Sequence, residues 1–441
     1  MANALLKNDK GLIRAWTFYD WANSVFPLVI TSAIFPNYYE YITSHVGKVS
    51  VGNDLPCFGG VFKNYSIYAY IYAFSLFLVA LTAPVLSGIA DYLGNRKRFL
   101  QFFCYLGAIS CGCLYFFDRN HPEISFIPFV SATIGFWGSL VFYNSYLPEI
   151  ASREEQDRVS ARGFAMGYLG SSILLIVCLI LIVVLGVSAK YSFILVGFWW
   201  IGFAQITFKR LPNSSSTKVR DASSGHILTK GFREIKNVMK EVMCHTNLKR
   251  FLTSYFFYNM GVQTVMVMAV LFAREEIVWV DEKTKTNSLI VSILLIQFLG
   301  IAGSFLFSWV SRKIGNLNTL AICIIIWIGI CVFTFSVAHF PIHFYILAAA
   351  VGLVMGGIQS LSRSTYSKYL PETEDHASFF SLYDVLEKLG MILGTLSFGL
   401  ISEATGGMRN AVLSLIAYFI IGLILLFFIP RIDSQSREVK S

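Results

Sequence analysis

Charged residues are scarce in this chain: of its 441 residues only 14% are Asp, Glu, Lys or Arg, whereas 55% are apolar. Soluble globular domains carry about 25% charged residues. The scarcity therefore argues against an ordinary soluble protein. The apolar residues gather instead in segments close to the roughly 20 residues that a membrane-spanning helix needs.

Twelve such segments can be drawn, and they predict an all-α membrane protein with twelve transmembrane helices. The first follows a short polar start and is long enough to stay in the membrane, so we expect no cleavable signal peptide. The segments lie at about 14–41, 66–90, 98–117, 124–147, 161–186, 191–208, 250–273, 288–311, 317–338, 343–364, 377–402 and 409–430.

Sequence motifs of enzymes and ATP-driven pumps are missing. The chain has no His-Glu-x-x-His, no Gly-x-Ser-x-Gly and no Gly-x-x-x-x-Gly-Lys-Ser/Thr, and none of its seven His lies deep in a predicted span. Its eight Cys show neither a disulfide framework nor the spacing of a metal site. We therefore expect no enzyme, no ATPase, no metal and no cofactor.

Positive charge is distributed unevenly along the chain, whose net charge is +9. Of the Lys and Arg residues, 26 lie on the side that holds both termini, 8 lie on the other side, and Lys388 lies inside a span. This asymmetry predicts that both termini are cytoplasmic, and it argues against a nucleic-acid partner. The charged turn from Ser152 to Arg162 then lies in the cytoplasm, and we expect it to be solvated.

Residues 209–249 are predicted to link two halves of the chain on the cytoplasmic side. Residues 213–225 have the composition of a flexible linker. Residues 228–243 alternate bases with apolar residues at helical spacing. Two interpretations of that helix stay open: it lies on the anionic inner leaflet, or it is solvated.

Three short motifs occur twice and in the same order, with offsets of 239, 221 and 223 residues. This order predicts a duplicated unit of six helices with the copies in parallel, at 1–208 and 250–441. The pairs are Phe18-Tyr-Asp20 with Phe257-Tyr-Asn259; Ser87, Gly94 and Asn95 with Ser308, Gly315 and Asn316; and Tyr146-Leu-Pro-Glu149 with Tyr369-Leu-Pro-Glu372.

The stretch from Ser87 to Arg98 resembles the loop between helices 2 and 3 of the major facilitator superfamily. The matching residues are Gly88, Ala90, Asp91, Gly94, Arg96 and Lys97, while Tyr92 stands where that family usually has a base. The resemblance implies the major facilitator fold, close helix contact at the glycines, and an Asp that interacts with the cytoplasmic end of the other half. We expect the gate to comprise Gly88, Asp91, Gly94, Arg96, Arg312 and Arg363.

Four longer stretches resemble the autophagy-related vacuolar effluxer-like branch of this superfamily. They are Phe18–Phe26, Asn144–Glu149, Ser160–Gly170 and Gly357–Lys388. In fungi this branch is associated with export of amino acids from the vacuole. For this chain we expect a bacterial-type cell membrane in preference to a vacuole. Predicted helix 5 lacks a Gly-Pro pair and predicted helix 4 lacks Arg, which argues against a drug/proton antiporter.

Polar residues within the apolar spans are the candidate solute-binding residues. A charge at the centre of a span costs roughly 2.5–3.5 kcal/mol on insertion scales, so such residues face protein or a cavity. The predicted set is Asp20, Asn23, Asn259, Gln263, Gln359, Asp384 and Lys388.

Asp384 and Lys388 are four residues apart and can pair along one helix face, with Glu387 beside them. A purely structural ion pair stays open as the alternative. Asp20 has an equally open alternative, which is to tie its helix to a neighbour. If transport is coupled to protons, Asp20 is the better candidate for the proton carrier.

These features together predict a secondary transporter that moves a small polar solute by alternating access. Amino acids suit both the acids, base and amides within the spans and the family resemblance. The alternative is a non-transporting receptor or a lipid-handling protein on the same fold. The expected partners are the solute, a coupling proton and membrane lipids, with no nucleic acid, and we expect a monomer.

Overall fold

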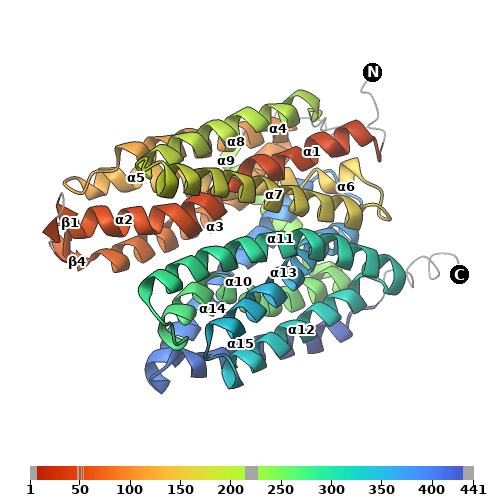
Figure 1. Cartoon of the computed structure of the whole chain (residues 1–441). Helices are drawn as coiled ribbons and strands as arrows, with labels where there is room; N and C mark the ends of the chain where they lie inside the picture. The colour runs from red at the N-terminus through yellow and green to blue at the C-terminus, as the bar shows by residue number, and fades with distance from the viewer. Residues whose placement is uncertain (1–6, 47–48, 51, 53, 214–226, 431–441) are drawn as a thin grey trace, which may run out of the picture. The chain divides into compact units, whose positions relative to one another are not determined.

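The computed structural model describes residues 7–46, 49–50, 52, 54–213 and 227–430, and it is almost entirely helical (Figure 1). Within these residues, eleven helices are long and apolar enough to cross a membrane. They are built on α3 (Asn64–Leu93), α4 (Arg96–Cys113), α5 (Pro122–Asn144), α7 (Gln156–Leu179), α8 (Lys190–Arg210), α10 (Thr246–Glu276), α11 (Glu282–Ile314), α12 (Asn316–Ser336), α13 (Pro341–Tyr369), α14 (His376–Thr405) and α15 (Met408–Phe427).

The first predicted span, 14–41, is divided into three consecutive helical segments. These are α1 (Lys10–Asn23), the π-helix η1 (Phe26–Ile34) and α2 (Phe35–Ser44). Pro27 and Pro36 lack the backbone N–H that a regular α-helix needs, so the α-helix is interrupted here, and π-helical hydrogen bonding occurs as local segments within α-helices. The hydroxyl of Thr31 donates to the carbonyl oxygen of Pro27 at 2.7 Å. Each segment is shorter than a full span, which explains eleven long helices where the sequence predicts twelve spans.

Shorter elements complete the described chain. The segment between α2 and α3 forms two small antiparallel strand pairs, β1 (His45–Val46) with β2 (Val49–Ser50) and β3 (Asp54–Cys57) with β4 (Gly60–Lys63). The 3-10 helix η2 (Leu114–Phe116) follows α4, α6 (Leu147–Ile150) follows α5, and the π-helix η3 (Ile180–Val184) follows α7. The predicted amphipathic helix is α9 (Ile227–Cys244). The predicted flexible linker lies outside the described residues, except for residue 213.

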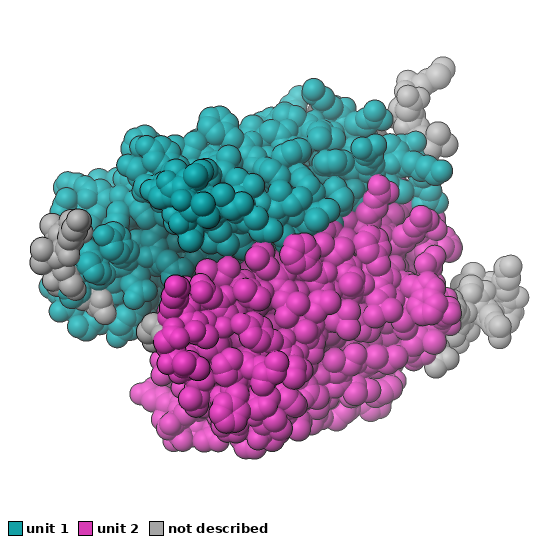
Figure 2. Space-filling view, in the orientation of Figure 1, with its two compact units in different colours: residues 1–146, 166–232 teal, residues 147–165, 233–441 magenta. Residues whose placement is uncertain are grey.

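The chain divides into two compact units. Unit 1 comprises residues 1–146 and 166–232, and unit 2 comprises residues 147–165 and 233–441 (Figure 2). In unit 1, α4 packs against α5 and α8, and α1 packs against α8. In unit 2, α11 packs against α13, and α10 packs against α14 and α15. The halves predicted from the repeats divide the chain by sequence order, and that division stays a prediction.

Small residues allow the closest helix contacts within each unit. In unit 2, a Cβ on Gly356 of α13 would overlap the carbonyl oxygen of Gly300 on α11. A Cβ on Gly394 of α14 would overlap the hydroxyl of Thr264 on α10. In unit 1, a Cβ on Gly170 of α7 would lie 2.8 Å from the carbonyl oxygen of Trp21 on α1. These contacts are those expected of small residues one helical turn apart in spanning helices.

Candidate functional site

Asp20 is buried in unit 1 and contacts a neutral donor. The phenolic hydroxyl of Tyr143, near the end of α5, donates to Asp20 Oδ2 at 2.7 Å. The indole N–H of Trp16 donates to the carbonyl oxygen of Tyr143 at 3.0 Å, and the two rings stack with centroids 4.4 Å apart. The tyrosine that orients Asp20 is therefore itself fixed by the preceding turn of α1. It is a site residue that the sequence did not reveal.

Asn23 lies one turn beyond Asp20 on α1 and is also buried. The hydroxyl of Ser24 donates to Asn23 Oδ1 at 3.4 Å. Asn23 Nδ2 is buried and has no hydrogen-bond partner among the residues that the structure describes. Asp20 and Asn23, three residues apart on α1, thus place a carboxylate and an amide donor within the protein.

Unit 2 contains a buried group of charges on α14. Lys388 is 0% exposed, and its ammonium forms an ion pair with Asp384 Oδ1. Glu387 Oε2 lies 3.6 Å from the same ammonium. The predicted pairing of Asp384 and Lys388 is therefore present, and Glu387 joins it as a second acid. Two carboxylates around one ammonium leave this group with an excess of negative charge.

Amide side chains on α10 extend the α14 charges. Gln263 Nε2 donates to Glu387 Oε1 at 2.7 Å and lies 3.5 Å from Asn259 Oδ1. Asn259 Nδ2 and Asp384 Oδ2 are buried and lack a hydrogen-bond partner within the described part of the chain. Four of the predicted solute-binding residues, together with Glu387, thus form one connected polar group, with an unused donor and an unused acceptor. We refer to Asn259, Gln263, Asp384, Glu387 and Lys388 as the unit 2 polar group.

Tyrosines adjoin the unit 2 polar group at Tyr383, the residue directly before Asp384. The ring of Tyr383 stacks on Tyr255 of α10 at 4.2 Å and on Tyr366 of α13 at 4.9 Å, measured between ring centroids. The hydroxyl of Tyr366 donates to the carbonyl oxygen of Phe379 at 2.6 Å. This packing holds α10, α13 and α14 together beside the charges. Gln359, the remaining predicted residue, is half-buried on α13.

The predicted gating loop in unit 1 is a tight turn between α3 and α4. Gly94 has φ of +64°, a left-handed conformation that suits glycine at a helix end. Asp91 and Arg96 are buried on either side of the turn, and Arg96 Nε lies 3.5 Å from Asp91 Oδ1. Gly88 is buried one turn earlier on α3. The turn thus pairs its own acid and base inside unit 1.

The two predicted gating arginines of unit 2 differ in their surroundings. Arg363 is buried on α13, where its Nε donates to Ser160 Oγ and its Nη2 donates to the Ser160 carbonyl oxygen, both at 2.9 Å. Its guanidinium also lies over the ring of Phe164, 4.3 Å from the centroid. Arg312 is exposed in the last turn of α11. Their proposed part in a gate stays a prediction.

The expectation that the whole turn from Ser152 to Arg162 is solvated is wrong for Asp157. Its Oδ2 accepts a hydrogen bond from Lys368 Nζ at 2.7 Å and another from the Ser311 hydroxyl at 3.1 Å. Its Oδ1 accepts from Asn316 Nδ2 at 2.7 Å. Side chains from α11, α12 and α13 thus surround one buried carboxylate, which compensates its desolvation. We call these four residues, Asp157, Ser311, Asn316 and Lys368, the Asp157 cluster.

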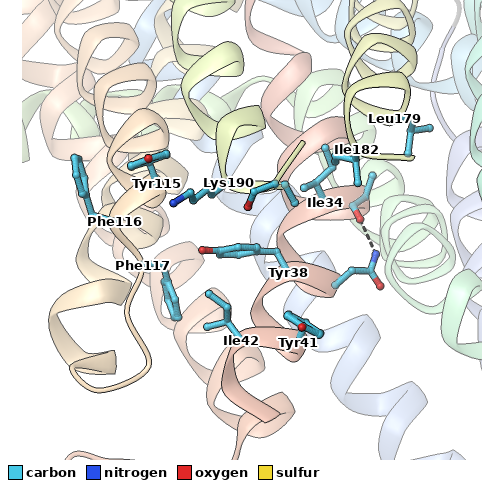
Figure 3. Close-up of a pocket in the computed structure, with 14 residues that line it drawn as sticks. Ile34, Tyr38, Tyr41, Ile42, Tyr115, Phe116, Phe117, Leu179, Ile182 and Lys190 are labelled. Atoms are coloured by element: carbon cyan, nitrogen blue, oxygen red, sulfur yellow. Dashed lines mark hydrogen bonds between the residues drawn. The ribbon is translucent and has the colours of Figure 1, made fainter. Parts of the chain in front are cut away.

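A separate cavity of about 770 Å³ opens within unit 1 (Figure 3). Aromatic side chains from α2 and from the segment after α4 line it, together with Lys190 at the start of α8. Tyr38 and Lys190 point into it in Figure 3, and Lys190 Nζ lies 4.6 Å from the ring centroid of Tyr115. The described residues that line this cavity include none of the seven predicted solute-binding residues.

The chain matches known transporters over nearly its whole length. The sequence model of one family, described as "Vacuole effluxer Atg22 like", matches residues 8–439. An "Uncharacterized MFS-type transporter YxiO" of Bacillus subtilis (strain 168) is 30% identical over 427 residues, which cover 95% of this chain and 94% of that protein. "Autophagy-related protein 22" of Vanderwaltozyma polyspora is 25% identical over 497 residues, covering 99% and 94%.

The fold has a counterpart among solved structures. The crystal structure of the major facilitator superfamily transporter FucP, in the outward conformation, superimposes with a TM-score of 0.68 at 13% identity, covering 96% of this chain and 98% of that one. This similarity confirms the predicted major facilitator fold. Together with the family match it confirms an integral, multi-pass membrane protein that is a transporter and not an enzyme. The chain belongs to the Atg22-like vacuole effluxer family of the major facilitator superfamily, whose members are secondary transporters.

Proposed function

We propose that this secondary transporter moves amino acids by alternating access, and that the unit 2 polar group contacts the solute. The observation that carries the proposal is the buried pair of Lys388 and Asp384, with the half-buried Glu387 beside it and joined to the Gln263 amide. An α-amino acid carries one carboxylate and one ammonium close together. Lys388 can bind the carboxylate of the amino acid, and Asp384 and Glu387 can bind its ammonium.

The energetics of the group favour a role beyond structure. A buried ion pair is weak evidence for stability, because desolvation of two charges can exceed their attraction. Here Asp384 also has a buried oxygen with no partner among the described residues. A solute ammonium would supply the missing donor, and the free amide N–H of Asn259 would have an acceptor in the solute carboxylate.

For coupling, we propose that a proton is carried by Asp20. Its carboxylate is buried and contacts the hydroxyl of Tyr143, a group that can hydrogen-bond the carboxyl in either protonation state. Lys388 is an unsuitable carrier, because loss of its proton would leave Asp384 and Glu387 facing each other without a base.

The proposed location is a bacterial-type cell membrane with both termini in the cytoplasm. The relative from Bacillus subtilis supports the membrane, and the distribution of Lys and Arg supports the orientation. The family description names an effluxer, so we propose export as the direction. Two variants test this orientation, each with a single cysteine: one has only Asp54→Cys, and the other has only the native Cys244. External labelling of the first but not of the second would support the orientation, and the reverse pattern would contradict it.

The experiment is efflux from proteoliposomes loaded with a mixture of the twenty amino acids. Release of each is measured with and without an imposed pH gradient. We expect a subset of the amino acids to leave faster than from vesicles without protein. We expect Lys388→Met to abolish this faster release. Asp20→Asn should abolish the response to the pH gradient while exchange of the same solutes persists. No accelerated release of any amino acid would refute the proposed substrate class, and full pH response in Asp20→Asn would refute the proposed carrier.

A further inference from the structure

We propose that unit 2 binds the phosphate headgroup of an anionic phospholipid in a pocket between the start of α7 and the end of α11. The pocket has a volume of about 490 Å³. It is lined by Arg158, Arg162, Phe305, Ser308, Trp309 and Arg312. The proposed site does not depend on the identity of the solute.

Helix geometry brings the basic residues together. Arg158 and Arg162 are four residues apart in the first two turns of α7, so they lie on one face. Arg312 is in the last turn of α11. Asp157, next to Arg158, accepts hydrogen bonds from Ser311 and Asn316 on either side of the α11 end. The Asp157 cluster therefore fixes the two helix ends that carry the arginines.

The positive charge in this pocket is poorly compensated. Arg158 lies 3.6 Å from Glu155, but their side chains are 69% and 40% exposed, so the pair contributes little. Arg162 and Arg312 form no ion pair with any residue in the described ranges. Asp157, the nearest buried acid, is paired with Lys368. Three guanidinium groups thus face one exposed carboxylate.

The neighbouring surface favours a lipid over a soluble anion. Phe305, Trp309 and Arg312 follow one another at helical spacing on α11, and the two aromatic side chains are 49% and 48% exposed. The ammonium of Lys313 lies 3.7 Å from the Trp309 ring centroid. Aromatic rings next to basic residues are typical of the membrane interface. An acyl chain can lie along Phe305 while its phosphate meets the arginines.

The chemistry of the site specifies the headgroup. Guanidinium groups bind phosphate oxygens with two parallel N–H donors, which a single ammonium does not offer. Basic pockets between spanning helices on the cytoplasmic side suit anionic headgroups. The Lys and Arg distribution predicts that this end of α7 and α11 is cytoplasmic. Phosphatidylglycerol is therefore a suitable probe, and zwitterionic phosphatidylcholine with the same chains is its control.

The test measures lipid binding to the purified full-length protein in detergent, by native mass spectrometry and by thermal stabilisation. Each basic group near an anionic surface contributes a factor of about five in affinity. We expect Arg158→Gln with Arg162→Gln to weaken phosphatidylglycerol binding about 30-fold. Both side chains are exposed, so folding should be preserved. Arg162→Lys keeps the charge but not the fork of donors, so its affinity for phosphatidylglycerol should lie between that of the unchanged protein and that of the double variant.

The matched control is Lys209→Gln with Arg210→Gln, which removes the same charge from exposed positions at the end of α8. It should leave phosphatidylglycerol affinity within twofold of the unchanged protein. Equal weakening in both double variants would overturn the site, because it would indicate a general response to net charge. Binding of glycerol 3-phosphate or inorganic phosphate as tight as that of the lipid would overturn the lipid assignment.

A second measurement uses phosphatidylglycerol with brominated acyl chains, which quench nearby tryptophan. The fluorescence lost on lipid addition should be smaller in Trp309→Phe than in the unchanged protein. The same lipid added to Arg158→Gln with Arg162→Gln should also quench less. Identical quenching in all three proteins would place the lipid elsewhere and refute the proposal.

Discussion

The two units bury their deep acids in different ways. In unit 1, Asp20 contacts a neutral phenol at 2.7 Å. In unit 2, Asp384 pairs with a fully buried ammonium, and Glu387 approaches the same ammonium. The predicted repeat matches Asp20 to Asn259, which carries no charge.

This difference separates what each acid can do. An acid held by a neutral donor can gain or lose a proton without leaving another buried charge unpaired. An acid paired with a buried base has no such freedom, because its neutralisation leaves the ammonium without compensation. Under the proposed function, Asp20 is the group that titrates and the α14 charges stay fixed. The predictions for Lys388, Asp157 and Asp20 test that contrast through the change in unfolding free energy, and a final prediction concerns a capping acid outside the spans.

The largest effect is expected for Lys388→Met. The substitution leaves the buried Asp384 and the half-buried Glu387 without their base, and breaking a buried pair such as Asp384 and Lys388 costs about 3–5 kcal/mol. The free energy of unfolding in mixed detergent micelles measures it. Asp384→Asn combined with Lys388→Met should recover much of the loss, because it removes the uncompensated carboxylate. A loss below about 1 kcal/mol for Lys388→Met alone would show that the group is not buried as charges.

The next effect is expected at the Asp157 cluster, where an acid has both a base and neutral donors. Asp157→Asn keeps the size of the side chain but removes its charge from Lys368, whose ammonium lies 2.7 Å away. Hydrogen bonds to charged groups contribute about 1.5–3 kcal/mol, so we expect a loss in that range. The matched control is Glu155→Gln, at an exposed acid two residues earlier. Equal losses in the two variants would contradict the importance of burial.

The spans and the deep charges could be predicted from the sequence because both are local patterns. Hydropathy locates each helix, and the four-residue spacing of Asp384 and Lys388 predicts their pairing. The irregular first span also follows from local chemistry, since Pro27 and Pro36 lie within it. In each case the interacting residues are close in the sequence.

Contacts between distant residues could not be predicted in this way. Asp157 and Lys368 are far apart in sequence, and the charged residues around Asp157 give it the composition of a solvated turn. Tyr143 is one of 22 tyrosines, and only the packing of α5 against α1 selects it as the partner of Asp20. Glu387 lies outside the predicted solute-binding set, because its side chain meets Gln263 only when α10 and α14 pack together.

A smaller effect is expected for Asp20→Asn, which tests the neutral side of the comparison. The amide oxygen can still accept the hydrogen bond from Tyr143, so the free energy of unfolding should change by less than about 1 kcal/mol. Tyr143→Phe, which removes the donor and keeps the ring, should cost more, about 1–2 kcal/mol. A loss for Asp20→Asn comparable with that for Lys388→Met would show that Asp20, too, is held as a charge by its surroundings.

The smallest effect is expected at the start of α11, where Asp281 caps the helix outside the predicted span. Its Oδ1 accepts from the backbone N–H of Thr284 at 2.7 Å and its Oδ2 accepts from the Thr284 hydroxyl at 2.8 Å. These hydrogen bonds, the backbone one first, lower the pKa of Asp281 from its ordinary value of about 3.9. The stabilisation is therefore complete above that value and is lost as the pH falls through the lower folded pKa. Asp281→Asn, still a good capping residue, should lower the melting temperature by about 1 °C at pH 7. The difference in melting temperature between Asp281→Asn and the unchanged protein should narrow on acidification below pH 4. A difference that widens would contradict the expected loss of stabilisation as Asp281 is protonated.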